Sequence, residues 1–306
     1  MSNETIILGG GVSGAICAYY IDKSILITES LGGQIEAKFP MGPRYLHKKI
    51  EIHNLLKELN LSLDTKSIKV GYYINGEYID KINDKLKAEY YSKSRGLTSI
   101  NKYPDSVLSD GLNNFEVFSI DMKDFYRAII SRISHNRIIN KKIEKIDIFN
   151  KVLFSNNEFF KYRKLINTIP KDVFLSMCGN FYIGKFFNPI TYLFVKSDFD
   201  LLGYDYVYFP EMSTSKFHRI TKIENGLVFD FAGVLLRSEV LYEAEKFMGT
   251  KFEISEMSKN MRAQIIGNDT TSDFEHIVHI GRFAELDHSI KVEDVIKHAR
   301  QIKNNI

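Results

Sequence analysis

Short apolar runs separated by glycine-rich turns mark the amino-terminal part of this 306-residue chain. Residues 5–8 form an apolar run that leads into three consecutive glycines, as expected of a buried parallel strand. Residues 12–21 are predicted to be a helix, and residues 24–29 a second apolar strand. This order of elements predicts a compact βαβ unit at the start of the chain.

Farther along, the apolar pattern predicts more helices and then a region dominated by strands. A hairpin is expected at 68–82, because Asn75-Gly76 is a favoured two-residue turn. Helices are expected at 48–59, 80–94 and 122–133, followed by a hairpin at 145–160 that turns near Phe149-Asn150 and by a strand at 164–169. The strand-rich region then contains expected strands at 190–195, 204–209, 217–221 and 227–233. It is followed by a helix from the N-cap Ser238 to 248 and by a strand at 277–280 before a C-terminal helix.

The composition is that of a globular enzyme, with 44% apolar and 26% charged residues. A formal net charge of +3 is too small to draw the whole protein to nucleic acid or to an anionic membrane. No apolar run is long enough to span a membrane. We therefore expect no membrane partner.

Cys17 and Cys178 lie far apart and form no disulfide framework, which fits a reducing cytoplasm. The chain has no Trp but many Lys, Asn and Ile, a bias typical of AT-rich coding in phages or low-GC bacteria. A cytoplasmic location is expected, in the host cytoplasm if the source is viral.

The turn between the first strand and the first helix carries the strongest chemical signal. Gly9, Gly11 and Gly14 match G-x-G-x-x-G, in which the glycines permit a tight turn, close approach of a pyrophosphate, and close helix–strand packing. The backbone N–H groups at the helix start, including those of Val12 and Ser13, would face the phosphates. The pattern predicts a dinucleotide site, whereas the alternative interpretation is a turn that merely contains glycines.

Residues after the second strand bear on which dinucleotide binds. Glu29 lies 20 residues after Gly9, where a carboxylate accepts hydrogen bonds from ribose hydroxyls; a solvated strand end is the alternative. Gly32 and Gly33, with Gln34, follow closely, as in many flavoproteins whose FAD phosphates pass this loop. No second G-x-G-x-x-G is present, which argues against separate FAD and NAD(P)H domains and favours FAD alone.

With these motifs the chain resembles the FAD-dependent amine-oxidase-like flavoproteins, particularly the branch of protoporphyrinogen oxidase and UDP-galactopyranose mutase. The similar segments are 6–14 with Glu29 and Gly32-Gly33, 39–47, 165–170, 206–211 followed by 217–220, and 281–284 followed by 294–296. The resemblance implies an α/β fold in which a Rossmann-like FAD-binding domain (1–70, 115–175 and 265–306) carries an inserted, sheet-based substrate domain (71–114 and 176–264).

The resemblance also implies site residues in the first domain. Arg44 and His47 follow Gly42-Pro43 in a segment that passes the flavin ring, and Arg44 stands where the mutases have His. Gly281 and Arg282 resemble the C-terminal FAD signature. The helix after them is expected to begin near Ser289 and Ile290, with its N-terminal dipole facing the flavin and stabilising the reduced anion.

The expected substrate domain contributes a second group of candidates. Arg219 follows His218 in a strand-like run, where a guanidinium can bind a phosphate or carboxylate through two hydrogen bonds, although a surface position is the alternative. Tyr206 and Tyr208 alternate on one strand face and either line a substrate cavity or belong to the core.

No metal site is expected. His276 and His279 are three residues apart on a predicted strand, which puts them on opposite faces. The cofactor would therefore supply the chemistry, and the protein would orient the reactants.

These features support three hypotheses about function. In each, a small-molecule substrate is expected, and the oligomeric state is left open, with a homodimer as one alternative. The first hypothesis is an oxidoreductase that transfers hydride from a small amine to flavin N5. The second is a non-redox UDP-sugar mutase that uses reduced FAD. The third is a flavin-bearing protein of a viral nucleotide or DNA modification pathway, for which nucleic acid would be a partner.

Overall fold

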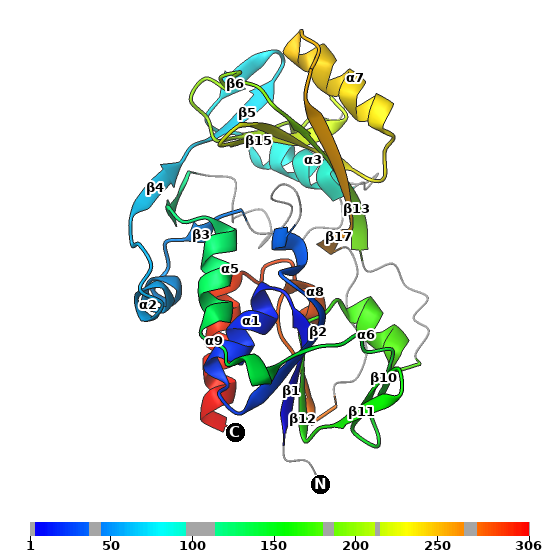
Figure 1. Cartoon of the computed structure of the whole chain (residues 1–306). Helices are drawn as coiled ribbons and strands as arrows, with labels where there is room; N and C mark the ends of the chain where they lie inside the picture. The colour runs from blue at the N-terminus through cyan, green and yellow to red at the C-terminus, as the bar shows by residue number, and fades with distance from the viewer. Residues whose placement is uncertain are drawn as a thin grey trace. The chain divides into compact units, whose positions relative to one another are not determined.

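The computed structural model describes residues 4–36, 44–95, 114–179, 187–211, 215–265 and 274–305. The chain divides into two compact units (Figure 1). Unit 1 comprises Met1–Thr65, Val117–Phe186 and Gly267–Ile306, and unit 2 comprises Lys66–Glu116 and Phe187–Ile266. None of the helices within the described ranges is long and apolar enough to cross a membrane.

Unit 1 is built on a five-stranded parallel sheet in the order β18-β12-β1-β2-β8. Its strands are β1 (Thr5–Gly10), β2 (Ser24–Leu31), β8 (Ile138–Asn140), β12 (Lys164–Asn167) and β18 (Ile277–His279). This order, in which the chain starts in the middle and proceeds outward on both sides, defines a doubly wound α/β sheet. The expected Rossmann-like fold class is confirmed.

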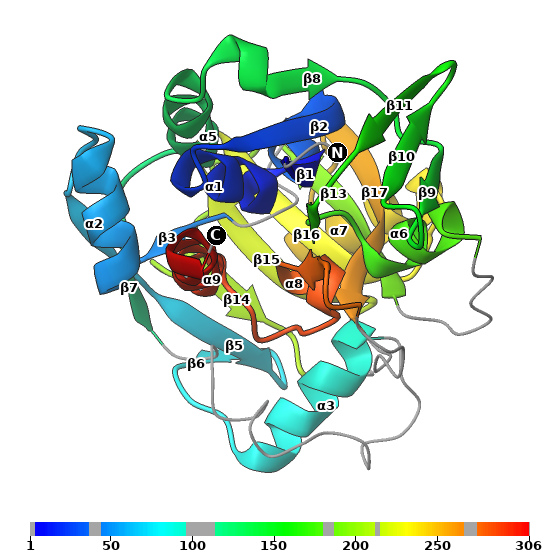
Figure 2. The ribbon, with the colours of Figure 1, turned by 90° about the horizontal axis from the view of Figure 1, so that it is seen from below.

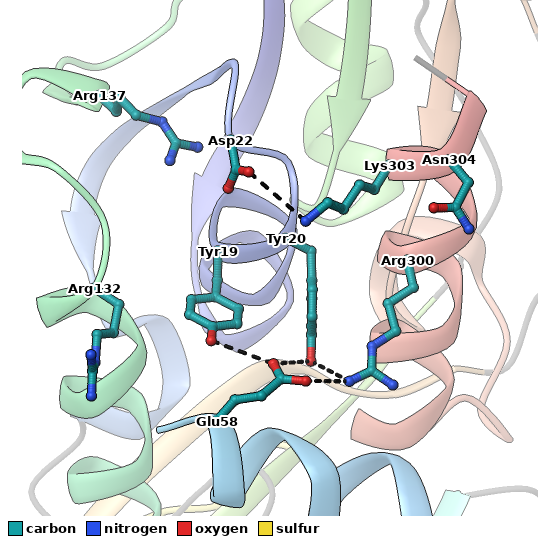
Figure 3. A pocket seen from close by; sticks show the side chains of 9 residues that line it. All are labelled: Tyr19, Tyr20, Asp22, Glu58, Arg132, Arg137, Arg300, Lys303 and Asn304. Carbon is teal, nitrogen blue, oxygen red and sulfur yellow. Dashed lines mark hydrogen bonds and ion pairs between the residues drawn. The ribbon is translucent and has the colours of Figure 1, made fainter. Parts of the chain in front are cut away.

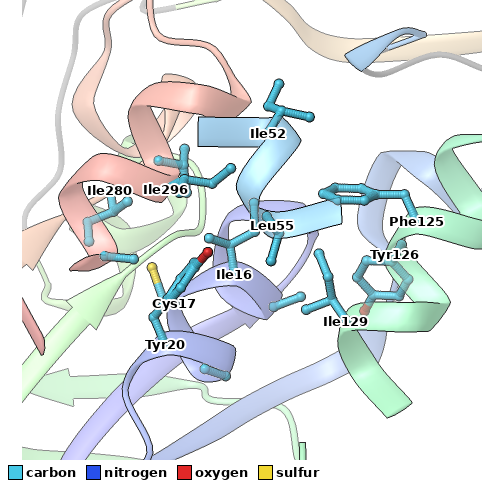
Figure 4. Packing of buried hydrophobic residues seen from close by; sticks show 14 of the residues in the cluster. Ile16, Cys17, Tyr20, Ile52, Leu55, Phe125, Tyr126, Ile129, Ile280 and Ile296 are labelled. Carbon is cyan, nitrogen blue, oxygen red and sulfur yellow. The ribbon is translucent and has the colours of Figure 1, made fainter. Parts of the chain in front are cut away.

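Four helices bury their apolar sides in a common core beside this sheet (Figures 2 and 4). They are α1 (Val12–Tyr20), α2 (Ile50–Glu58), α5 (Met122–Ser131) and α9 (Val292–Asn305). Each contributes at least one fully buried side chain, namely Ile16, Leu55, Phe125 and Ile296. Asp121 begins α5 by accepting hydrogen bonds from the backbone of Lys123 and Asp124.

Shorter elements complete unit 1. They are η1 (Gly33–Glu36), β3 (Leu46–His47), η2 (His135–Arg137), α6 (Lys171–Met177) and α8 (Arg282–Glu285). Two further strands, β4 (Thr65–Ile68) and β7 (Phe115–Phe118), lie where the chain passes between the units and join β3 in the order β3-β7-β4. The chain enters unit 2 for the second time at Phe187, later than the expected residue 176, because α6 packs with α8 inside unit 1.

The segment expected to be one hairpin at 145–160 is instead a three-stranded antiparallel sheet. It consists of β9 (Lys145–Asp147), β10 (Val152–Ser155) and β11 (Glu158–Lys161), in the order β11-β10-β9. The second turn places Asn156 at a φ of 50°, a conformation that Asn adopts more readily than most residues. In both ribbon views β10 and β11 lie on the side of the parallel sheet away from α1.

Unit 2 is a seven-stranded sheet in the order β17-β13-β16-β15-β14-β5-β6. Its strands are β5 (Val70–Ile74), β6 (Glu77–Ile79), β13 (Phe187–Val195), β14 (Tyr206–Tyr208), β15 (Phe217–Ile223), β16 (Gly226–Ala232) and β17 (Ser255–Ile265). The hairpin predicted at Asn75-Gly76 is present, as β5 and β6. Parallel pairing of β14 with β5 joins the two chain segments of this unit into one sheet.

Unit 2 also contains α3 (Asp84–Arg95) and α7 (Arg237–Met248). A cluster of phenylalanines from the strands packs with Val240 and Ala244 of α7. The predicted N-cap Ser238 was wrong, since α7 begins after Leu236. The Leu236 N–H donates to Glu239 Oε2 at 3.0 Å, so the acidic side chain inside the first turn fixes where this helix starts.

Arg137 closes the carboxyl end of α1 in unit 1. Its Nη2 donates to the carbonyls of Ala18 and Ile21, each at 2.7 Å, and its Nε donates to the carbonyl of Ser24 at 2.9 Å. The Ala18 carbonyl lies in the last turn of α1 and has no partner within the helix, so this guanidinium satisfies a group that would otherwise be costly to bury. The Ile21 carbonyl also accepts hydrogen bonds from the N–H and the hydroxyl of Ser24.

Replacing Arg137 with Met should therefore destabilise the protein by about 2–4 kcal/mol, through lost charge-assisted hydrogen bonds. Urea unfolding measures the change. Arg127→Met serves as the matched control, because Arg127 is exposed on α5 and, among the described residues, forms an ion pair only with Asp124. Equal stability of the two variants would contradict the structural role of Arg137.

Candidate functional site

The turn between β1 and α1 is shaped by a contact that leaves no room for a side chain. A Cβ added to Gly14 would lie 1.8 Å from the carbonyl oxygen of Gly9, so α1 packs directly on the end of β1. Gly9 itself has a φ of 113°, a conformation that strains residues with a side chain. The first and third glycines of the motif thus occupy positions that require glycine.

Gly11, the second glycine of the motif, has different surroundings. A Cβ at this position would meet no atom of the described residues within 4 Å, and the backbone φ of −76° is open to any residue. Gly11 is also the N-cap residue of α1, so no side chain caps this end of the helix. The first hydrogen bond of the helix is donated by Ala15 N to Gly11 O at 2.9 Å. The space beside Gly11 and the unbonded N–H groups at the start of α1 fit a pyrophosphate.

Tyr126 of α5 braces the turn from outside the motif. Its hydroxyl donates to Gly10 O at 2.6 Å and accepts from Gly32 N at 2.7 Å, while Gly32 N also lies 2.9 Å from Gly10 O. The first turn is thereby tied to the loop after β2. Sequence reasoning missed Tyr126, because no local pattern links a residue of α5 to glycines near the start of the chain.

The loop after β2 approaches the same turn. A Cβ on Gly33 would lie 3.3 Å from Gly11 Cα, and η1 carries Gln34 next to it. Glu29 lies near the carboxyl end of β2, exposed and 3.7 Å from Lys142 Nζ. Because β1 and β2 run parallel, Glu29 is at the sheet edge that holds the glycine turn. Its contact with a ribose remains a prediction.

The C-terminal Gly-Arg turn packs against the start of α1. Gly281 has a φ of 100°, and a Cβ there would lie 2.5 Å from Ser13 Oγ. Its N–H donates to Glu285 Oε1 at 2.8 Å. The glycine turn at 9–14 and the Gly281-Arg282 turn therefore lie side by side in unit 1. Neither motif by itself predicts this contact.

Arg282 is held by the segment that follows it. Its Nε donates to Ile290 O at 3.1 Å, and burial lowers its pKa, against the opposing effect of Asp287 and Glu293. The helix expected to begin near Ser289 instead begins at Val292. Asp287 accepts from both the N–H and the hydroxyl of Ser289, which holds this residue in a turn before the helix.

Of the two residues expected beside the flavin, His47 has the better-defined surroundings. It lies on β3, paired with Val117 of β7, and is half-buried. Burial lowers the pKa of His47 to about 4, helped by the positive charges of Lys291, Lys49 and Arg282. The imidazole is therefore neutral at pH 7. Arg44 lies just before β3, while Gly42-Pro43 lies outside the described residues.

The candidates of unit 2 share one face of its sheet. Arg219 forms an ion pair with Asp230, which is fully buried, and lies 5.4 Å above the ring of Tyr206. Tyr206 and Tyr208 stack with ring centroids 6.2 Å apart, and Tyr208 also contacts Tyr72. Both tyrosines are buried. The structure thus brings Arg219, Tyr206 and Tyr208 together.

Helix α3 adds groups that sequence reasoning missed. The Tyr90 ring lies 4.7 Å from that of Tyr208 and 5.9 Å from that of His218. Lys93 is buried and donates to Glu211 O at 2.7 Å and to Ser215 Oγ at 3.2 Å. Burial lowers the pKa of Lys93 to about 7. A polar helix with a single buried lysine gives no signal in the sequence pattern.

The two histidines considered as metal ligands make other contacts. His276 Nε2 lies 3.0 Å from Ile148 O, and His279 Nδ1 lies 2.9 Å from the side-chain amide of Asn167. Within the described residues, no group of His, Cys, Asp and Glu is arranged to hold a metal ion.

A scan against models of protein families gives no match, and neither does a sequence comparison with curated proteins. Solved structures with the same fold do match. A reduced UDP-galactopyranose mutase has a TM-score of 0.69 at 13% identity, covering 98% of this chain and 96% of that chain. A CLA-producing fatty acid isomerase from P. acnes has a TM-score of 0.72 at 9% identity, covering 100% of this chain and 99% of that chain.

A cyclohexylamine oxidase from Brevibacterium oxydans IH-35A has a TM-score of 0.71 at 9% identity, covering 100% and 98%. The chain therefore has the fold of these solved structures, which confirms the expected resemblance at the level of fold. These three structures belong to a mutase, an isomerase and an oxidase, so the fold is compatible with more than one reaction.

The different surroundings of Gly11 and Gly14 lead to opposite expected effects of adding one methyl group. Gly14→Ala should destabilise the apoprotein by about 3 kcal/mol or more, because its Cβ overlaps backbone. Gly11→Ala should leave stability within about 1 kcal/mol of wild type but weaken dinucleotide binding at least about tenfold, because its Cβ fills the space beside the phosphates. Urea unfolding and cofactor titration test both; unchanged cofactor affinity in Gly11→Ala would exclude this turn as the site.

His47 should make stability depend on pH. Below about 6.5 the unfolded chain protonates this imidazole while the native protein does not, so the free energy of unfolding decreases as pH falls toward 4. His47→Asn should lose less stability than wild type between these two pH values. Urea unfolding at several pH values measures this, with the exposed His135→Asn as control. Parallel pH profiles for His47→Asn and wild type would contradict it.

Proposed function

We propose that the chain is an FAD-dependent oxidoreductase that oxidises a small amine or related metabolite. The observation that carries the proposal is the assembled turn of unit 1. Gly11 leaves space open in front of unbonded helix N–H groups, and Gly281 packs on Ser13 beside it. Such a place fits the pyrophosphate of a dinucleotide, and the superfamily whose fold the chain has is FAD-dependent.

In this proposal unit 1 binds the cofactor and unit 2 binds the substrate. The backbone of Gly11, Val12 and Ser13 would bind the pyrophosphate, Glu29 the ribose, and the loop of Gly32 and Gly33 the phosphate side. Neutral His47 can donate or accept a hydrogen bond but carries no charge at pH 7 that would repel a cationic amine.

When bound, the flavin supplies the acceptor for a hydride from the carbon next to the amine nitrogen. The amine loses two electrons and becomes an imine, and molecular oxygen takes the two electrons and ends as hydrogen peroxide. The protein's task is then to bind and orient the amine and to exclude water. The tyrosine-rich face of unit 2 suits this, because aromatic rings attract ammonium groups.

The Arg219–Asp230 ion pair favours amine oxidation over the sugar-nucleotide mutase reaction. A mutase of this kind must hold the diphosphate of UDP, and that hypothesis was motivated by the segment Gly42-Pro43-Arg44-Tyr45 together with Arg219. In the structure Arg219 Nε and Nη2 both donate to one oxygen of the buried Asp230. A guanidinium whose charge is already balanced by a buried carboxylate has less to offer a diphosphate.

The proposal is tested on purified protein loaded with FAD. Anaerobic addition of small primary and secondary amines should bleach the flavin's visible absorbance for at least one of them. Admitting oxygen should then restore the colour and release one peroxide per amine oxidised. Gly11→Ala, which should lose FAD, is the matched control for adventitious reduction.

Two results would overturn the proposal. A protein that stays colourless after incubation with FAD does not bind the cofactor. A flavin that dithionite bleaches but no amine does, together with a melting temperature that UDP raises, would favour the mutase instead.

A further inference from the structure

A cavity lies in unit 1 at the end of α1 that is remote from the glycine turn (Figure 3). Its volume is about 540 Å³, within the range of pockets that bind small molecules. It is bordered by the last turn of α1, the end of α2, the C-cap of α5 and the last turns of α9. The nine residues of α1 separate it from the glycine turn by about 13 Å along the helix axis.

Charged side chains dominate the lining. Four are basic (Arg132, Arg137, Arg300 and Lys303) and two are acidic (Asp22 and Glu58), so the cavity has an excess of two positive charges. The positively charged groups come from α5, η2 and α9, which approach the cavity from different sides (Figure 3).

Two of the basic residues already form several hydrogen bonds with other groups of the protein. Arg137 closes the end of α1, as described above. Arg300 donates to Glu58 Oε1 at 2.9 Å and to the Tyr20 hydroxyl at 3.0 Å, and lies over the Tyr20 ring. These contacts hold the side chains of Arg137 and Arg300 in fixed positions in the lining of the cavity.

The other two are available to a ligand. Lys303 approaches Asp22 only at 3.8 Å, and both side chains are largely exposed. Arg132 is exposed, and its guanidinium makes neither a hydrogen bond nor an ion pair with the described residues, although its backbone N–H donates to Ile129 O. A guanidinium held at a helix end without a partner is suited to bind an oxyanion through two hydrogen bonds.

We propose that this cavity binds a small organic phosphate, with Arg132 contacting the phosphoryl group. The excess of two positive charges matches a phosphate group, which carries roughly two negative charges at neutral pH, better than a single carboxylate. The volume exceeds that of a bare phosphate and leaves room for the organic part beside Tyr19.

A purely structural explanation exists for the same arginines. Basic residues near the carboxyl ends of helices stabilise the helix dipole, and Arg132 is the C-cap of α5. That role predicts an effect of Arg132 on stability but none on anion binding, so the two explanations differ in what a titration measures.

The test uses isothermal titration of FAD-saturated protein with inorganic pyrophosphate, at constant ionic strength. Wild type should bind it, and Arg132→Gln should bind at least about tenfold more weakly, because a charge-assisted hydrogen bond is lost. The control Arg127→Gln removes one charge from an exposed position on the same helix and should bind like wild type. Citrate, which carries only carboxylates, should bind more weakly than pyrophosphate.

The glycine turn is also expected to accept a pyrophosphate, so the two sites must be separated. FAD occupies the turn in the saturated protein, and Gly11→Ala titrated without FAD serves if the cofactor does not load. Binding retained in Gly11→Ala supports the second site whatever the fate of the FAD proposal. No binding to wild type, equal binding by Arg132→Gln and Arg127→Gln, citrate binding as tightly as pyrophosphate, or loss of binding in Gly11→Ala would each overturn it.

Discussion

The direct packing of α1 on β1 is the constraint on which the site depends. With no side chain at Gly14, the helix backbone lies against the Gly9 carbonyl, and this contact fixes the position of the helix start. The Tyr126 hydroxyl and Gly281 then act on a turn that is already in place, one by linking Gly10 with Gly32 and the other by packing on Ser13. A looser helix would leave the N–H groups without a fixed direction.

Local signals in the sequence were sufficient for the βαβ unit and for the hairpin at Asn75-Gly76. Both are decided by neighbouring residues, through apolar runs, glycines and a two-residue turn. The C-terminal Gly281-Arg282 turn was found through resemblance, and only the structure shows that it lies against Ser13. The parallel sheet of unit 1 was predicted from the family resemblance, because the strands β8 and β18 are too short to be recognised from their own residues.

Features that depend on distant residues could not be predicted. Strand β17 is polar along most of its length and lies at a sheet edge, so it lacks the apolar alternation that identifies strands. Asp230 had no recognisable role until pairing of β15 with β16 placed it beside Arg219. Likewise, the start of α9 depends on the side chains of Asp287 and Asp294, which accept hydrogen bonds from the backbone N–H groups of Ser289 and Lys291 in the preceding turn.

The arrangement of strands along the chain constrains how the protein is made. The parallel sheet of unit 1 needs β18, which is formed by Ile277–His279, and the sheet of unit 2 needs strands from both of its chain segments. A chain emerging from the ribosome completes the sheet of unit 1 only after Ile277–His279 has been synthesised, and the sheet of unit 2 only after β17 (Ser255–Ile265). Until these late strands arrive, each sheet exposes an unpaired edge beside β12 or β13, and such edges favour aggregation.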